Sequence, residues 1–193
     1  MIKIDRPQCP NPTALSGGNY KHEENKATLM NASSEKCMYC ESKITHIDYG
    51  DVEHIKPKSQ FPELKLEWDN LGYACTRCNR EYKKDKYVED TPYVNPYDEE
   101  PSEHILASGS FLLQKQGSER GELTIQDIGL NRPSLIEKRQ QKIDEINKSI
   151  NGCFRTKNET LKENALHELK KEADKDKEYS FSVKSLLTLN NIN

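Results

Sequence analysis

Two cysteine pairs constrain this chain more than any other feature. Cys37 and Cys40 form one CxxC pair, and Cys75 and Cys78 form a second, separated from the first by 34 residues. A two-residue gap lets both thiolates of a pair bind one ion, so two pairs supply the four sulfurs of a tetrahedral structural zinc site. A redox CxxC motif is the alternative, but it needs only one pair and usually lies in a βαβ unit, which this sequence does not predict. We therefore expect these four cysteines to hold one structural zinc ion.

The composition indicates why such a cross-link would matter. Of 193 residues, 33% are hydrophobic and 32% are charged, so the hydrophobic core must be small for this length. A structural zinc ion can contribute on the order of 10 kcal/mol of binding energy that appears as folding energy. Cys9 and Cys153 have no comparable neighbours in the sequence and are expected to be ordinary thiols.

The same composition limits the location and the partners of the chain. The amino terminus lacks the apolar run of a secretory signal, and no segment approaches the ~20 apolar residues that span a bilayer. We expect a cytoplasmic protein, in which thiols stay reduced and six cysteines argue against a disulfide framework. The formal net charge of -3 disfavours a protein that coats nucleic acid through long-range attraction alone, so any such contact must be local or assisted.

The chain divides into three expected parts with an α+β architecture overall. Residues 1–35 are polar and rich in turn residues, and form an irregular lead-in with a short helix from His22 to Met30. Residues 36–130 contain the cysteine pairs and an extension, in which two alternating segments predict a small β-hairpin. Residues 131–193 are expected to be helical. The two segments of the predicted hairpin are Phe111–Gln114 and Leu123–Gln126.

The helical part has a clear beginning and an apolar end. Pro133 suits a first helical turn, with Asn131 as its cap, and apolar residues then recur at helical spacing. Near the end, Ser180 or Ser182 could cap a last short helix that buries three leucines. This region is expected either to pack on its own core or to bind a partner. The three leucines are Leu186, Leu187 and Leu189.

The segment between the cysteine pairs holds the residues with catalytic potential. Glu53 and His54 are neighbours in a predicted strand that ends at Pro57, so their side chains should point to opposite faces. Asn70 follows in the same segment, and Asn79 comes directly after the last cysteine. The other four histidines lack a comparable context and are expected to be structural or solvated; they are His22, His46, His104 and His167.

These motifs together resemble a known family. The stretches VEHIKPKS, EWDNLGYACTRCN, VNPYDEEPSEHI and LTIQDIGLNRPSLIEKR are similar to those of the zinc-bearing HNH nucleases of retron-associated and Septu-type anti-phage systems. The similarity runs from about Cys37 to Arg139. It implies a ββα-metal fold with a structural zinc ion, and an endonuclease that hydrolyses phosphodiester bonds, of DNA by family analogy.

The resemblance also implies a role for each matching residue. His54 would be the general base, Glu53 and Asn79 would hold a catalytic cation, and Asn70 would brace the loop. The last motif position carries Asn where His is usual, which makes this chain an HNN variant, and Glu53 stands where Asp is common. Both side chains bind hard cations through oxygen, which favours Mg²⁺ or Mn²⁺ over zinc at the catalytic position.

The chemistry of phosphodiester hydrolysis explains why a carboxylate and an imidazole should face apart. The attacking water and the leaving oxygen lie on opposite sides of phosphorus, so base and cation should approach from different sides. His54 must be neutral to act as a base, and a neighbouring group such as a backbone carbonyl should fix its tautomer.

Local charge suggests limited contact with nucleic acid. From Asp51 to Lys86 there are eight basic and seven acidic residues, a balance of only +1. Helical spacing after the last cysteine pair could still bring several long basic side chains to one face, where they would contact phosphates. These candidates are Arg77, Arg80, Lys83, Lys84 and Lys86.

So small a basic surface favours help from a partner protein. The family resemblance implies an ABC-type ATPase, in some systems with a reverse transcriptase and its RNA. The alternative to a nuclease is a non-catalytic zinc module that binds nucleic acid or a protein, which would need the four cysteines but not Glu53, His54 or Asn79.

Overall fold

The computed structural model describes residues 1–44 and 49–192. Its helices are α1 (Pro12–Ser16), α2 (Glu23–Ala32), α3 (Glu119–Asp127), α4 (Pro133–Arg155), α5 (Glu159–Lys170) and α6 (Ser180–Leu189). Its strands are β1 (Asp51–His54), β2 (Leu71–Ala74), β3 (Ile105–Ser108) and β4 (Phe111–Gln114). Short 3-10 turns are η1 (Pro62–Leu64), η2 (Trp68–Asn70), η4 (Pro101–Glu103) and η5 (Lys171–Ala173), and η3 (Arg77–Lys83) is a π-helical segment. No helix within these ranges combines the length and the apolar character needed to cross a bilayer.

A two-stranded hairpin followed by η3 forms the centre of the fold. β1 and β2 pair antiparallel, with Glu53 opposite Gly72 and His54 opposite Leu71. The first cysteine pair lies against β2, because the backbone of Met38 donates to the carbonyl of Tyr73 at 2.9 Å. A Cβ atom at Gly72 would overlap the sulfur of Met38, so glycine allows this close approach. The α+β class and the small sheets agree with the sequence-based expectation.

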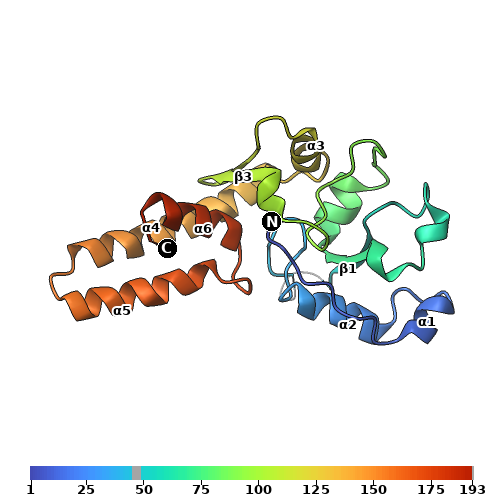
Figure 1. Cartoon of the computed structure of the whole chain (residues 1–193), viewed down its shortest axis with the longest axis horizontal. Helices are drawn as coiled ribbons and strands as arrows, with labels where there is room; N and C mark the ends of the chain where they lie inside the picture. Colours follow the sequence, from blue (N-terminus) through green and yellow to red (C-terminus); the bar gives the residue numbers. More distant parts are fainter. Residues whose placement is uncertain (45–48, 193) are drawn as a thin grey trace.

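The lead-in contains more structure than the sequence predicted. α1 was not expected, and α2 runs from Glu23 to Ala32 where His22–Met30 was expected. The segment before α1 crosses the molecule: the backbone of Ile4 donates to the carbonyl of Pro96, and Arg6 donates to the carbonyl of Trp68. In Figure 1, α1 and α2 lie beside the hairpin that carries β1.

The second hairpin differs from the predicted one. β4 occupies Phe111–Gln114 as expected, but it pairs with β3, whereas Leu123–Gln126 belongs to α3. The prediction was wrong because a short alternation also fits a capped helix: the Ser118 side chain accepts a hydrogen bond from the backbone of Gly121, and Thr124 and Ile125 are buried on one face of α3.

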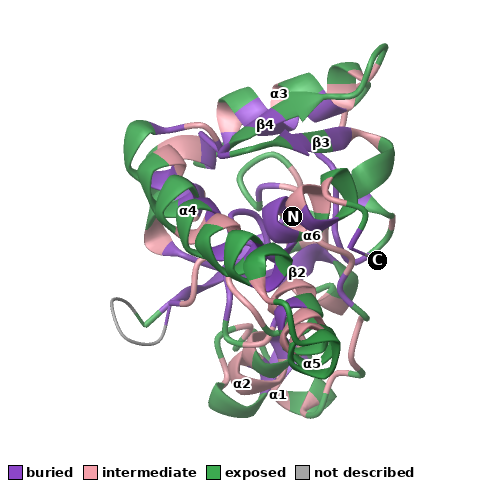
Figure 2. Cartoon of the chain, turned by 90° about the vertical axis from the view of Figure 1, so that its left-hand side faces the viewer, coloured by how far each residue is buried: buried purple, intermediate pink, exposed green. Residues whose placement is uncertain are grey.

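α4 and α5 form an antiparallel pair that projects from the body of the molecule (Figure 1). α4 begins at Pro133 as predicted, but Asn131 does not cap it. The Asn131 side chain instead bonds the backbone of Leu112 in both directions, at 3.0 and 2.7 Å, and so joins β4 to the start of α4. Figure 2 shows exposed outer faces on α4 and α5, with buried residues on α6.

α6 packs on its own chain rather than extending from it. Neither Ser180 nor Ser182 caps the helix: the position before its first residue is Tyr179, and both serines are buried. Of the three leucines expected to be buried, Leu187 is buried, Leu186 is partly buried and Leu189 is 74% exposed. The expectation that Leu189 is buried was wrong, because Leu189 is the last residue of α6 and lies on the outer side of the helix. The apolar cluster around α6 contains Ile146, Ile150, Leu169, Val183, Leu187 and Ile192.

We predict that the substitution Leu187→Ala destabilises the protein, because it leaves a cavity in the cluster that joins α4, α5 and α6. The free energy of unfolding should fall by about 2–5 kcal/mol, measured by chemical denaturation. Leu189→Ala on the same helix is the control and should change stability by less than about 0.5 kcal/mol. Equal effects of the two substitutions would contradict this packing.

Candidate active site and metal centre

The four cysteines of the two CxxC pairs come together in the structure. The sulfurs of Cys37, Cys40, Cys75 and Cys78 all lie within 4.8 Å of one another, and all four residues are buried. Burial raises the pKa of the Cys37 thiol, whereas hydrogen bonds from the other three thiols lower the pKa of Cys40. Four buried sulfurs cannot all be anionic unless a dication lies among them, so this donor set fits a structural zinc ion.

A buried arginine lies against this cluster. Arg132, next to the start of α4, donates from Nη1 to the sulfur of Cys78 at 3.4 Å. A zinc ion with four thiolates carries a net charge of about -2, so a guanidinium group in contact with one sulfur offsets part of that charge. The cluster therefore also anchors the helical region to the zinc-bearing core.

Glu53 is held from both sides by residues next to the two cysteine pairs. Its Oε1 atom accepts a hydrogen bond from the hydroxyl of Tyr39 at 3.2 Å. The same atom forms an ion pair with Lys83 Nζ at 2.7 Å. Glu53 and Lys83 are each only 1% exposed. Burial raises the pKa of Glu53, while Lys83 and Tyr39 oppose this rise. Within the described part of the chain, Oε2 has no hydrogen-bond partner, so one oxygen of this carboxylate stays open to a ligand.

The π-helical segment η3 lies opposite β1 and supplies the other polar groups. Asn79 Nδ2 donates to Asp51 Oδ2 at 3.3 Å, which leaves Asn79 Oδ1 as the free acceptor of the amide. Arg80 also pairs with the Asp51 carboxylate through two nitrogens. The wide turn of a π-helix, closed here by the bond from the backbone of Lys84 to the carbonyl of Asn79, is a feature often found at functional sites. It brings Asn79 and Lys83 to the face that meets β1.

The ring of His54 is fixed by two contacts. Nε2 lies 3.0 Å from the carbonyl oxygen of Lys65, which can only accept, so Nε2 carries the proton and Nδ1 has the free lone pair. The ring of Tyr20 packs edge-on against the imidazole, with 4.7 Å between centroids. Burial lowers the pKa of His54, an effect that the nearby lysines reinforce and the carbonyl opposes. The imidazole is therefore neutral at pH 7, with the tautomer held by a backbone carbonyl.

Asn70 connects the two ends of the loop that supplies this carbonyl. Its Oδ1 accepts from the backbone of Lys56 at 2.8 Å, and its Nδ2 donates to the carbonyls of Lys56 and Leu64 at 3.0 and 3.1 Å. Leu64 is next to Lys65, whose carbonyl orients His54. A buried amide with these bonds braces the loop and, through it, the imidazole.

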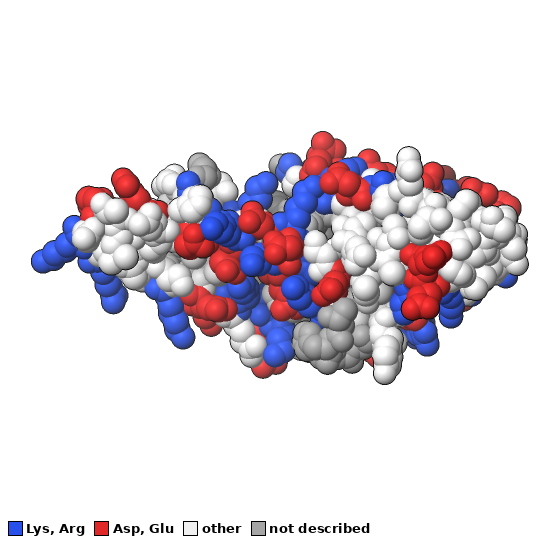
Figure 3. Space-filling view, turned by 90° about the horizontal axis from the view of Figure 1, so that it is seen from below, with Lys and Arg blue, Asp and Glu red and all other residues white. Residues whose placement is uncertain are grey.

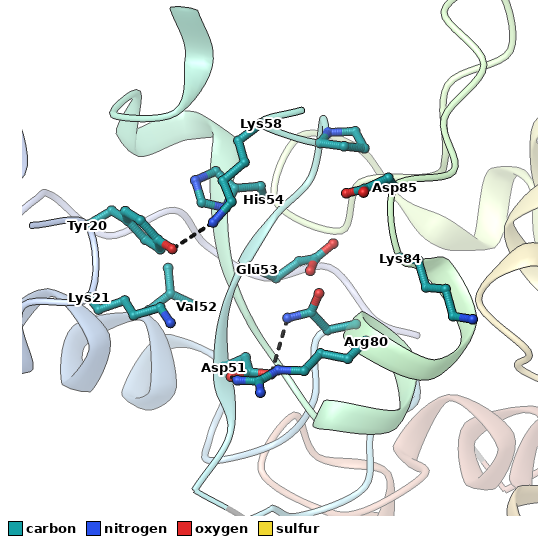
Figure 4. A pocket seen from close by; sticks show the side chains of 12 residues that line it. Tyr20, Lys21, Asp51, Val52, Glu53, His54, Lys58, Arg80, Lys84 and Asp85 are labelled. Carbon is teal, nitrogen blue, oxygen red and sulfur yellow. Dashed lines mark hydrogen bonds and ion pairs between the residues drawn. The ribbon is translucent and has the colours of Figure 1, made fainter. Parts of the chain in front are cut away.

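Glu53, His54 and Asn79 line one pocket of about 260 Å³. Figure 4 shows it from close by: Tyr20, Lys21 and His54 lie on one side of β1, and Arg80, Lys84 and Asp85 lie on the other, with Glu53 between them. The strand thus presents an imidazole and a carboxylate to different flanks of a shared space, as the alternation of side chains requires. Asn70 lies outside the lining of this pocket.

The five basic residues predicted to bind nucleic acid differ in their burial, their ion-pair partners and their distance from the pocket. Lys83 is buried against Glu53 and also donates to the carbonyl of His54 at 2.9 Å. Arg80 pairs with Asp51 in the pocket, and Lys84 lies exposed at its edge. Arg77 and Lys86 lie outside the pocket lining and pair with Glu81 and Asp127. The structure thus brings Arg80, Lys83 and Lys84 to the site, but Lys83 has no exposed ammonium group.

Sequence reasoning missed several residues of the site. Asp51 could have been found, because it lies two residues before Glu53 and therefore on the same strand face. Tyr20 comes from the loop between α1 and α2, and nothing in its spacing marks it. The four remaining histidines have other positions: His104 bonds Glu99 and Ser118, His22 and His167 lie outside the pocket lining, and His46 lies outside the described residues.

Comparison with known proteins identifies a family domain over the segment that carries this pocket. The sequence model of the HNH endonuclease family matches residues 37–85, which include both cysteine pairs and the residues of β1, β2 and η3 that line the pocket. A Septu protein PtuB of Bacillus thuringiensis is 30% identical over 97% of this chain and 82% of its own length. A second PtuB, from Bacillus mycoides, is 31% identical over 66% of this chain.

A third relative comes from a retron. It is a candidate HNH endonuclease of retron Vc95 from Vibrio cholerae serotype O1 biovar El Tor, and it is 30% identical over 61% of this chain and 62% of its own length. This chain spans about half the length of the Bacillus mycoides relative, 53%, and most of the Bacillus thuringiensis one.

We predict that Cys40→Ser removes the bound zinc and unfolds the core, because on the order of 10 kcal/mol of folding energy depends on the complete ligand set. Metal analysis should give one zinc ion per wild-type chain and clearly less for the variant, with a lower melting temperature. Cys9→Ser is the control, since Cys9 lies outside the cluster and only bonds Asn25. Retention of a full zinc ion by the Cys40 variant would contradict the assignment.

We also predict that Lys83→Met destabilises the protein by about 3–5 kcal/mol, because it leaves the Glu53 carboxylate buried without its counter-charge. Lys84→Met is the matched control: Lys84 is the next residue, is exposed and should affect stability by less than about 0.5 kcal/mol. Urea denaturation measures both. A stable Lys83 variant that binds nucleic acid less tightly would instead favour a direct contact between Lys83 and phosphate.

Proposed function

The chain belongs to the family of the Septu PtuB proteins and carries an HNH endonuclease domain; on this basis we propose that it hydrolyses phosphodiester bonds of DNA with a divalent cation, as the effector of an anti-phage defence system. The observation that supports the proposal is that His54, Glu53 and Asn79 line one pocket, with Nδ1 of His54 and Oδ1 of Asn79 as free acceptors.

His54 acts as the general base in this proposal. Its Nδ1 takes a proton from the attacking water while Nε2–H remains on the Lys65 carbonyl, so the imidazolium that forms keeps its orientation and gains a stronger hydrogen bond. The lowered pKa of His54 keeps the ring neutral before the reaction. Asn70 acts indirectly, by fixing the loop from Lys56 to Leu64 that positions this carbonyl.

Glu53 and Asn79 are the residues that would hold the cation, through Oε2 and Oδ1. Their oxygen donors suit Mg²⁺ or Mn²⁺, and a cation bound there would neutralise charge on the scissile phosphate and its leaving oxygen. Two of the three carboxylates that line the pocket already have cationic partners, Arg80 for Asp51 and Lys83 for Glu53. Phosphate oxygens of the substrate would therefore have to complete the coordination, as is common for Mg²⁺ in nucleotide-processing sites.

The proposed partners follow from the resemblance to Septu and retron nucleases. An ABC-type ATPase, in some systems together with a reverse transcriptase and its RNA, would deliver the nucleic acid. Because α6 is packed in the core, the exposed end of the α4–α5 pair is the better docking surface. Phe154 and Leu161 lie there, 53% and 59% exposed.

Co-purification with an ABC-type ATPase encoded beside this protein tests that surface. The double variant Phe154→Asp/Leu161→Asp should no longer co-purify with the ATPase, because it would place two charges where the complex would bury apolar side chains. Val88→Asp is the control, because Val88 is an exposed apolar residue on the nuclease core, 45% exposed. Undiminished recovery of the ATPase with the double variant would reject this docking surface.

We predict that His54→Ala slows metal-dependent nicking of supercoiled plasmid by about 10²–10⁴-fold, the contribution typical of a general base. His167→Ala is the control, since His167 is exposed on α5 and lies outside the pocket lining. Parallel assays with DNA and RNA of one sequence decide the substrate class.

Zinc content and melting temperature must match between these variants, so that loss of folding does not imitate loss of the base. Equal nicking by wild type and His54→Ala would reject His54 as the base. Nucleic-acid binding by the wild type without metal-dependent nicking would favour a zinc-dependent binding module instead.

A further inference from the structure

The basic side chains on the two sides of the pocket differ in their partners. On the η3 side, Arg80 and Lys83 are paired with the carboxylates of β1. On the opposite side, Lys21 and Lys58 line the same pocket and are exposed, and no ion pair within the described ranges joins either of them to a carboxylate. Two exposed lysines without a carboxylate partner therefore lie on the His54 side of β1, whereas on the η3 side Lys84 is the one exposed lysine among the described residues that line the pocket.

Tyr20 organises this side of the pocket. Its hydroxyl accepts a hydrogen bond from Lys58 Nζ at 2.9 Å, while its ring packs edge-on against His54. The ammonium groups of Lys58 and Lys21 lie 5.0 and 5.7 Å from the centre of the same ring. Figure 4 shows Tyr20, Lys21 and Lys58 together beside His54, with a dashed line from Lys58 to Tyr20. One aromatic side chain thus gathers two cations next to the proposed base.

The surrounding structure holds these residues in place. Tyr20 and Lys21 lie in the loop between α1 and α2, and the buried side chain of Asn25 ties this region together by bonding the backbone of Asn11 in both directions, at 3.0 and 3.1 Å. Lys58 lies four residues after His54 and directly follows the buried Pro57. Both halves of the cluster are therefore anchored to packed parts of the molecule.

The electrostatic state of Tyr20 agrees with an excess of positive charge. Burial alone would raise the pKa of Tyr20, yet its pKa is lowered, because the hydrogen bond from Lys58 and the charges of Lys58, Lys21 and Lys65 stabilise the phenolate form. A field that favours a phenolate also favours a phosphate oxygen. On the face seen in Figure 3, by contrast, acidic and basic side chains are mixed.

We propose that Tyr20, Lys21 and Lys58 form a phosphate-binding wall that holds a backbone phosphate of the nucleic-acid strand beside His54. This inference rests on the proposed nuclease function and adds the residues that seat its substrate. Lys58 and Lys21 supply the charge, and Tyr20 positions Lys58 through its hydroxyl. The segment 1–35 thereby becomes part of the substrate site.

The wall also explains how a chain with a net charge of -3 could hold nucleic acid. Each lysine that neutralises a phosphate releases a counterion, so a few well-placed ammonium groups give measurable, salt-dependent binding. Their location on the attacking side would keep the scissile phosphate within reach of His54, while Glu53 and Asn79 approach from the other flank.

Binding of fluorescently labelled duplex DNA, measured by anisotropy without Mg²⁺ or Mn²⁺ over a series of salt concentrations, tests the wall independently of catalysis. The double variant Lys21→Ala/Lys58→Ala should bind about tenfold or more weakly at low salt. The slope of log affinity against log salt should fall in magnitude by about 1.8, which corresponds to two lost phosphate contacts. Tyr20→Phe keeps the ring but removes the acceptor for Lys58, and should weaken binding less than the double variant does.

The control variant is Lys148→Ala/Lys157→Ala, which removes the same charge from exposed residues on α4 and the loop after it. Its affinity and salt slope should equal those of the wild type. Loss of binding equal to that of the double variant would mean that net charge alone matters, and would overturn the wall.

Two other outcomes would also overturn the inference, and they separate it from the proposed function. If the Lys21→Ala/Lys58→Ala double variant binds DNA with the affinity and salt slope of the wild type, the phosphate-binding wall is rejected. The nuclease proposal is then still decided separately, by plasmid nicking with wild type and His54→Ala. If the wild type shows no salt-dependent binding at all, the wall is rejected as well. The nicking assay again judges the nuclease proposal on its own.

Discussion

The cross-link between the two cysteine pairs is the interaction on which the rest of the site depends. Cys37 and Cys40 are separated from Cys75 and Cys78 by a segment that contains β1 and β2, and a zinc ion would close this segment into a loop. Both groups that hold Glu53 lie next to this cross-link: Tyr39 is between the first two cysteines, and Lys83 is five residues after the last one. The position of the carboxylate therefore follows from the geometry of the four sulfurs.

The second governing feature is that both carboxylates of β1 are paired with cations before substrate arrives. Glu53 and Asp51 are each neutralised by a cation from η3, so neither carboxylate repels a phosphodiester strongly, and neither attracts a metal ion as strongly as an unpaired one would. Breaking such a buried pair is costly, which keeps the side chains in place. Two exposed lysines, Lys21 and Lys58, lie across β1 near His54, and Lys84 lies at the opposite edge of the pocket. In the proposed mechanism, this arrangement would give the substrate and the cation different sides of the pocket.

The sequence predicted the cysteine cluster and the family domain better than it predicted the supporting elements. The cysteine cluster, the HNH domain and the start of α4 at Pro133 agree with expectation. The predictions for Asn131 as a helix cap and for Leu123–Gln126 as a strand were wrong. A capping residue or a four-residue alternation carries little information by itself, because the same residues can make other contacts once distant segments meet. The side chain of Asn131, for example, forms hydrogen bonds with the backbone of Leu112 instead of capping α4.

What the sequence determined by itself was the set of reactive groups: four thiols at metal-binding spacing, and a carboxylate and an imidazole on alternate faces of one strand. These are local properties, fixed by residue type and backbone periodicity. Only the tertiary structure decided which cations are used internally and which are left for a ligand. Lys83 and Lys84 are neighbours in the sequence, yet one is buried against Glu53 and the other is exposed, and Tyr20 reaches His54 across 33 intervening residues. Such differences arise from long-range packing, because burial and pairing of a charge depend on segments that no local pattern identifies.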